Sequence, residues 1–110
     1  MKKLKLIVKN LSAKVEVMTL QEQLTEAASN GDLTAVKQAI EAGADIHDGN
    51  DEALQWAAYN GHLPVVKYLV KLGSDIHADN DFALRWAAHN GYTETTEYLQ
   101  MVIKLRAVNL

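Results

Sequence analysis

The chain has 110 residues, a hydrophobic fraction of 48% and a formal net charge of −3, as expected for one globular domain of modest core. It contains no cysteine, which excludes disulfides and thiolate metal sites, and no apolar run approaches the ~20 residues of a membrane span. The small net charge gives no general attraction for nucleic acid or for a membrane surface. Lys5 and Lys9 interrupt the apolar start, so we expect no signal peptide and an intracellular, cytoplasmic protein.

Residues 1–18 form a basic N-terminal arm, in which five lysines stand against Glu16 alone. Apolar and polar residues alternate on both sides of Asn10-Leu11-Ser12, and this period of two predicts a short β-hairpin. A helix also fits, because apolar residues recur at helical spacing at Leu4, Ile7, Val8, Leu11 and Val15. The frequent β-branched residues favour the hairpin. Lysines without arginine or aromatic residues favour a solubilising arm over a nucleic-acid or anionic-lipid tether.

The rest of the chain repeats itself with a period of 30 residues. Residues 50–61 read NDEALQWAAYNG, and residues 80–91 read NDFALRWAAHNG. A fainter copy lies thirty residues earlier, with Leu24, Ala27-Ala28 and Asn30-Gly31 in phase. Self-similarity at a fixed period of this length indicates a stack of repeats, each too small to be stable alone.

The first repeat covers residues of about 19–43. Thr19 and Glu22 have the spacing of a capping box, which predicts a helix from Leu20 to about residue 29. Asn30-Gly31 ends this helix, because glycine readily takes a positive φ. A second helix is expected over residues 33–41, before Gly43.

The second repeat covers residues 44–73 and begins with a loop rich in turn-forming residues. We expect Asp51 to cap the next helix, with its carboxylate on the free backbone amides. Asn60-Gly61 ends that helix. Pro64 suits the first turn of the following helix, where its missing N–H has no partner to lose, and Gly73 closes the repeat.

The third repeat, residues 74–106, starts in the same way but has a different second helix. A polar run over residues 93–97 replaces an apolar one, and the helix is expected to continue towards Arg106. This is typical of a terminal repeat with a polar outer face. The apolar tail, residues 101–110, either folds back over the last repeat as a lid or presents a surface for a second copy or further repeats.

Spaced motifs in these repeats resemble those of ankyrin repeats. They are Gly43-Ala44-Asp45-Ile46-His47, Ala57-Ala58 before Asn60-Gly61-His62-Leu63, and Val65-Val66-Lys67-Tyr68-Leu69-Val70 before Gly73. The resemblance covers residues 20–103. It implies an all-α solenoid of about three helix-turn-helix repeats over residues 19–110, which binds proteins through projecting fingers and the exposed side of the first helices.

The period of 30 is three residues short of the usual ankyrin repeat. The missing residues fall between Gly43 and Asp51 and between Gly73 and Asp81, where the family has its β-hairpin finger. We therefore expect a tight turn in place of each finger, which leaves the first helices as the binding surface.

At 100° per residue, the first helix of the second repeat has two different sides. Leu54, Ala57 and Ala58 lie on one side, and Glu52, Trp56 and Tyr59 lie on the other. The corresponding exposed positions are Phe82, Trp86 and His89 in the third repeat and Glu22, Glu26 and Ser29 in the first. One face of the stack is thus expected to change from acidic to aromatic along its length.

This face is the predicted partner-binding site, because Trp, Tyr and Arg are the residues that most often anchor interfaces. The predicted set is Trp56, Tyr59, Phe82, Arg85, Trp86 and His89, with Gln55 at its flank. The alternative is that both tryptophans are structural and pack against the next loop and second helix.

Neither a metal site nor a catalytic site is predicted. No two histidines have the i, i+3 or i, i+4 spacing of a helical metal site, and the equivalent His47 and His77 are explained by structural hydrogen bonds. The recurring aspartates are explained by turns and helix caps. The sequence contains neither a nucleophile paired with a base nor a glycine-rich phosphate loop.

The sequence therefore predicts a protein–protein interaction module without catalytic activity, cofactor, metal, nucleic acid or membrane partner, which binds an unidentified protein. The alternative is a structural module that self-associates as a homodimer through the arm or the apolar tail.

Overall fold

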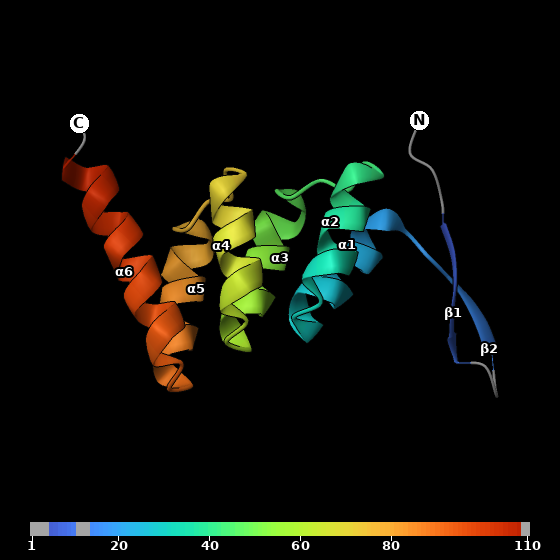
Figure 1. Ribbon diagram of the computed structural model, residues 1–110, viewed down its shortest axis with the longest axis horizontal. Coiled ribbons are helices and arrows are strands. Elements are labelled where there is room, and N and C mark those ends of the chain that lie inside the picture. Colours follow the sequence, from blue (N-terminus) through green and yellow to red (C-terminus); the bar gives the residue numbers. More distant parts are fainter. Residues whose placement is uncertain (1–4, 11–13, 109–110) are drawn as a thin grey trace.

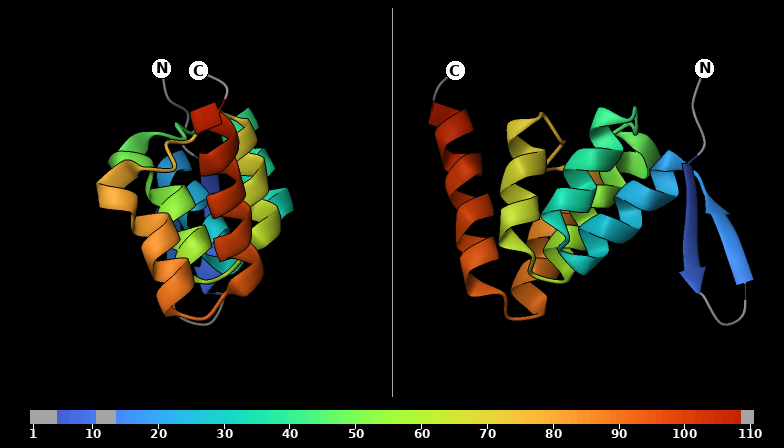
Figure 2. Two further views of the ribbon diagram at one scale, coloured as in Figure 1. Left: turned by 90° about the vertical axis from the view of Figure 1, so that its left-hand side faces the viewer. Right: turned by 45° about the vertical axis from the view of Figure 1, so that its right-hand side comes forward.

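The structure is a computed structural model that describes residues 5–10 and 14–108. Its helices form three helix-turn-helix pairs in two layers (Figure 1). The first-helix layer contains α1 (Leu20–Asn30), α3 (Asp48–Tyr59) and α5 (Ala78–His89). The second-helix layer contains α2 (Leu33–Glu41), α4 (Leu63–Lys71) and α6 (Thr93–Val108). Each helix contacts its partner in the pair and its neighbours in the layer, so the pairs lean on one another as predicted for a solenoid (Figure 2).

The N-terminal arm contains two antiparallel strands, β1 (Lys5–Asn10) and β2 (Lys14–Met18), with Leu6 opposite Val17. This is the arrangement that the period-two alternation favoured over a helix; residues 11–13 between the strands lie outside the described part. The strand pair stands to one side of the helical stack (Figure 1). Its junction with α1 is fixed by Met18, which is buried and whose carbonyl accepts a hydrogen bond from Gln23 Nε2 at 3.1 Å.

Local sequence signals explain where the helices begin. The Glu22 amide donates to Thr19 Oγ1 and the Thr19 amide donates to Glu22 Oε1, both at 3.0 Å, which confirms the capping box of α1. Pro64 lies in the first turn of α4, as predicted. Asp32 caps α2 through a 3.0 Å hydrogen bond from the Ala35 amide.

Near their first residues, α3 and α5 each contain three consecutive residues in the left-handed helical region, which kink the start of the helix. These are Gly49-Asn50-Asp51, with φ of 61–63°, and Asp79-Asn80-Asp81, with φ of 53–60°. Gly, Asn and Asp are the residue types that adopt this conformation most readily. In the second and third repeats, a short left-handed turn therefore takes the place of the longer loop that the missing residues would form.

This turn corrects the prediction that Asp51 caps α3. With a positive φ, its carboxylate does not reach the amides of its own helix. Asp51 Oδ2 instead accepts a hydrogen bond from the Asp75 amide of the next repeat, at 2.8 Å, and interacts with His47 Nδ1 at 3.0 Å. Gln21 occupies the same place one repeat earlier, where its Oε1 accepts from the Asp45 amide at 3.1 Å. The side chain at this position thus links two successive repeats instead of capping its own helix.

Two further contacts recur at the period of the sequence. Asn60 Nδ2 donates to the Ser29 carbonyl at 3.1 Å, and Asn90 Nδ2 donates to the Tyr59 carbonyl at 2.9 Å. Aromatic rings also cover the glycines that end the first helices. A Cβ added at Gly31 would collide with the His62 ring, and a Cβ added at Gly61 would collide with the Tyr92 ring. These contacts hold successive pairs at one spacing.

The core lies between the two layers and is built largely from small residues. Ala27, Ala28, Ala57, Ala58 and Ala87 are all buried, which lets neighbouring helices approach closely. The larger core residues are Leu24, Leu54, Leu69, Leu99, Val36, Val65 and Val66. Ala88 is exposed, because no described helix covers that side of α5.

The C-terminal segment does not fold back as a lid. Residues 93–108 form one uninterrupted helix, since no glycine or proline breaks it and good helix formers dominate its second half. Thr96 and Gln100 occupy the places of the buried Val66 and Val70 of α4, so part of its outer face is polar. Beyond them, Met101, Leu105 and Val108 are exposed. No described helix has the length and apolar character that a membrane crossing needs.

Candidate functional site

Five aromatic rings lie next to one another across α3 and α5, and we call them the aromatic strip: Trp56, Tyr59, Phe82, Trp86 and His89. Residues three and four apart on a helix share a face, which places the rings of each helix in a row. The packing of α3 against α5 then sets the two rows side by side. The structure thus brings together five of the six residues predicted from the sequence.

The ring centroids of the strip form a continuous chain of contacts. Trp56 lies 5.3 Å from Tyr59 and 6.2 Å from Phe82, both with edge-to-face geometry. Tyr59 in turn lies 5.4 Å from Trp86, which lies 4.9 Å from His89. These separations are within the range of favourable aromatic pairs. Each ring therefore limits the movement of the next, and the strip is a preformed surface.

The strip is partly buried by its own contacts but remains open to solvent. Trp56 is 36% exposed and His89 is exposed, whereas Tyr59, Phe82 and Trp86 are half-buried. Both indoles therefore lie at the surface rather than in the interior. On the opposite side of the same helices, Ala57 and Ala87 are fully buried, which confirms the predicted division of α3 and α5 into two sides.

Arg85, the sixth predicted residue, points away from the strip. Its Nε donates to the Asn80 carbonyl at 2.8 Å, so the guanidinium covers the left-handed turn at the start of α5. Gln55 has the same role in the preceding repeat, where Nε2 donates to the Asn50 carbonyl at 2.6 Å. Three consecutive left-handed residues leave carbonyls without helical partners, and these side chains satisfy them.

The strip continues into a hollow of about 760 Å³ between α1 and the start of α3. Trp56 belongs to both, and the rest of the hollow carries four carboxylates, on Glu22, Glu26, Asp48 and Glu52. The indole nitrogen of Trp56 donates to Glu52 Oε1 at 3.2 Å, so one carboxylate is held beside the ring. The acidic end of the predicted face is therefore present, but sequence spacing did not identify Asp48, the first residue of α3, as part of it.

Three of the four histidines are accounted for by hydrogen bonds to the chain. His47 and His77 interact through Nδ1 with the carboxylates of Asp51 and Asp81, and His62 Nε2 lies 2.9 Å from the Ser29 carbonyl. This confirms the structural role predicted for His47 and His77. Across residues 5–10 and 14–108, no three His, Asp or Glu side chains are placed to hold a metal ion.

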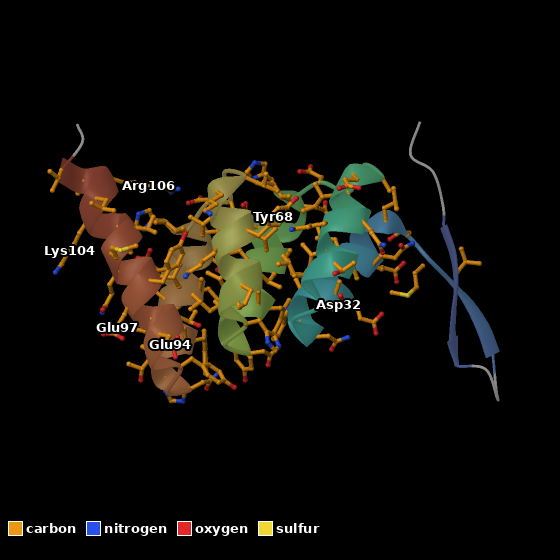
Figure 3. All side chains as sticks on the ribbon, viewed as in Figure 1. Asp32, Tyr68, Glu94, Glu97, Lys104 and Arg106 are labelled. Atoms are coloured by element: carbon orange, nitrogen blue, oxygen red, sulfur yellow. The ribbon has the colours of Figure 1, made fainter. Side chains whose placement is uncertain are left out.

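The second-helix layer has a different character, because its aromatic rings are covered by lysines. Lys37 Nζ lies 5.3 Å from the centroid of the Tyr68 ring, and Lys67 Nζ lies 5.6 Å from that of Tyr98 (Figure 3 labels Tyr68). Burial raises the pKa of the Tyr98 hydroxyl, and the nearby Arg106 offsets part of this increase. Among the aromatic rings on the described helices, those without a lysine over them therefore belong to the first-helix layer.

A family model described as ankyrin repeats in three copies matches residues 24–107. The chain belongs to the ankyrin repeat family. No curated protein matches it. Ankyrin repeats are protein–protein interaction modules, and members of the family are typically scaffolds without enzymatic activity. The aromatic strip lies on the first helices of two ankyrin repeats, on the side away from the alanines between the layers.

Proposed function

We propose that this ankyrin repeat protein binds a protein partner through the aromatic strip. The observation that carries the proposal is the continuous set of ring contacts from Trp56 to His89, open to solvent on adjacent repeats. A partner protein is the ligand that suits it, because such rings provide large contact area and lose little freedom on binding.

The strip has the composition of an interface centre. Trp and Tyr are enriched among residues whose truncation costs more than about 2 kcal/mol of binding energy. Trp56, Tyr59 and Trp86 lie within one chain of ring contacts. Polar groups at its edge, on His89 and Glu52, are placed to orient a partner rather than to supply most of the affinity. In this proposal the chain has no catalytic role and needs no cofactor.

A selection for binding proteins with the full chain as bait tests the proposal. The affinity of each selected binder is then measured for the wild type and for the variant Trp56→Ala/Trp86→Ala. The matched control is Tyr68→Ala/Tyr98→Ala, which removes two rings from the second-helix layer. We expect the tryptophan variant to weaken binding at least about a hundredfold and the tyrosine variant to leave it within about threefold.

Circular dichroism separates a lost surface from a lost fold. If the tryptophan variant retains its helical signal and loses its binders, the strip is the binding site. If it unfolds, the rings are structural. Binders that tolerate the tryptophan variant but not the tyrosine variant would place the site on the second-helix layer and contradict the proposal.

Self-association is the second candidate function, and exposed apolar side chains on α6 favour it. Met101, Leu105 and Val108 lie at i, i+4 and i+7 and so share one side of the helix. Val17 in β2 is exposed as well. Sedimentation of the wild type beside Met101→Glu/Leu105→Glu tests a homodimer through this tail, and Val17→Glu tests one through the arm. A monomer at all concentrations would reject this candidate.

A further inference from the structure

We propose that the partner segment is cationic and carries an apolar anchor, with its lysine or arginine side chains in the acidic hollow and its anchor on the aromatic strip. This inference rests on the proposed function and adds the chemistry of the partner. It commits to a segment of another protein that lies across α1, α3 and α5.

The first step is that the strip and the hollow form one surface. Trp56 contacts Tyr59 and Phe82 on one side and lines the hollow on the other. The hollow is open, and its wall is formed by α1, the two residues before it and α3. A segment that covers Trp56 therefore lies against aromatic rings at one end and carboxylates at the other.

The second step is that charge is segregated between the two layers. The first-helix layer, α1, α3 and α5, contains seven Asp and Glu residues and one cation, Arg85. The other cations of the six helices all lie in the second-helix layer, at Lys37, Lys67, Lys71, Lys104 and Arg106 (Figure 3 labels the last two). The guanidinium of Arg85 is directed to the turn at the start of α5. The first-helix layer therefore presents a negative field to any segment that approaches it.

The third step concerns the hollow itself. Its described lining contains the carboxylates of Glu22, Glu26, Asp48 and Glu52 and no Lys, Arg or His. Glu22 and Glu26 have interactions of their own within the chain, so a cation from a partner pairs first with Asp48 or Glu52. Like charges on one wall attract cations and repel phosphates and acidic segments, which gives selectivity between partners. A nucleic acid or an acidic peptide is thus disfavoured at this surface.

The contact between Trp56 and Glu52 shows how a cation is accommodated. The indole N–H donates to Glu52 Oε1, so the carboxylate lies at the edge of the ring. An arginine or lysine that pairs with Glu52 brings its aliphatic stem along the indole, and a guanidinium there gains a cation–π contribution as well. The apolar anchor of the same segment then lies on Tyr59 and Phe82, whose ring centroids are 6.3 Å apart.

A matched pair of labelled peptides tests the inference on the full chain. In one short fluorescein-labelled peptide, lysine alternates with leucine and phenylalanine; in the other, glutamate replaces every lysine. Binding is followed by fluorescence anisotropy at low and at physiological salt. We expect the lysine peptide to bind at least about tenfold more tightly than the glutamate peptide, with a difference that shrinks as salt rises.

The variant Glu26→Gln/Asp48→Asn/Glu52→Gln removes three of the four carboxylates of the hollow while retaining the shape of its side chains, and it keeps Glu22, which belongs to the capping box of α1. The amide oxygen that replaces the Glu52 carboxylate can still accept from the indole. Its control, Glu41→Gln/Glu94→Gln/Glu97→Gln, removes the same charge from exposed positions in the second-helix layer (Figure 3 labels Glu94 and Glu97). We expect the hollow variant to bind the lysine peptide about tenfold more weakly and the control to change affinity less than about twofold.

Three outcomes would overturn the inference. They are equal binding of the two peptides, equal weakening by the hollow variant and its control, and a large gain of affinity when Lys5, Lys9 and Lys14 are changed to glutamine. The last would assign the hollow to the chain's own basic arm. If selected protein binders still depend on Trp56 and Trp86 but not on the hollow carboxylates, the cationic partner is wrong and the proposed function stands. If they depend on neither, both fail.

Discussion

The carboxylate of Asp51 accepts a hydrogen bond from the backbone amide of Asp75 at 2.8 Å, although 24 residues separate the two along the chain. Asp51 is only 5% exposed, and its other partner is the ring of His47. The contact joins the left-handed turn of the second repeat to the loop of the third. Asp51, which the sequence predicts to be a helix cap, therefore links two repeats.

The first prediction is that Asp51→Ala lowers the free energy of unfolding by about 1–3 kcal/mol more than Asp81→Ala does. Both residues have a positive φ, so an alanine there carries the same backbone penalty. Asp81 has a 43% exposed side chain and bonds only to His77 among described contacts. Urea unfolding gives the free energy of unfolding of each variant, and the difference between the two reports the contribution of the inter-repeat hydrogen bond. Equal losses would show that this bond adds nothing to stability.

Gly61 and Gly91 offer a second comparison of equivalent positions. Their φ values are 73° and 80°, so a side chain is equally unfavourable at both. A Cβ at Gly61 would overlap the Tyr92 ring, whereas a Cβ at Gly91 would meet no atom within 4 Å. We expect Gly61→Ala to cost about 1–3 kcal/mol more than Gly91→Ala, because the ring must move. Thermal unfolding of both variants gives the difference, and a negligible one would mean that Tyr92 rotates away freely.

Much of this architecture follows from the sequence alone. The 30-residue period indicated the three helix pairs, the Thr19–Glu22 spacing indicated the start of α1, and 100° per residue placed Trp56 and Tyr59 opposite Ala57. Each signal is local or depends on the equivalence of repeats. Such information is sufficient when the same short helix pair is stacked several times.

Contacts that depend on a rare backbone conformation could not be predicted in the same way. Gly49-Asn50-Asp51 is a sequence of residues that tolerate a positive φ, yet three in succession are unusual, so an ordinary N-cap was the better local expectation. The directions of Gln55 and Arg85 follow from carbonyls that this turn exposes. Asp48 directly precedes this turn, and regular helical spacing did not place it in the hollow.

The left-handed turns give a third prediction, at Asn80. This residue is exposed and has a φ of 58°, and it is held in the turn through its backbone carbonyl, which accepts from Arg85. A β-branched residue is strongly disfavoured there. We expect Asn80→Val to lower stability by about 1–2 kcal/mol and Asn80→Gly to be nearly neutral. Chemical unfolding of the pair measures this difference, and equal stabilities would show that the turn relaxes to another conformation.

The last prediction uses the two alanines that occupy one position in successive repeats. Ala58 is fully buried between α3 and its neighbours, whereas Ala88 on α5 is exposed because no described helix lies beyond it. Ala58→Leu overfills a seam that depends on close helix approach and is expected to cost about 1–3 kcal/mol. Ala88→Leu adds the same atoms to open surface, and its effect should stay within about 0.5 kcal/mol. Because both variants exchange alanine for leucine within a helix, the change in helix propensity is the same, and the difference in unfolding midpoint reports packing alone. If leucine at 88 lowered stability as much as leucine at 58, the side of α5 on which Ala88 lies would have to be covered in solution. Such covering is expected of a self-associating chain.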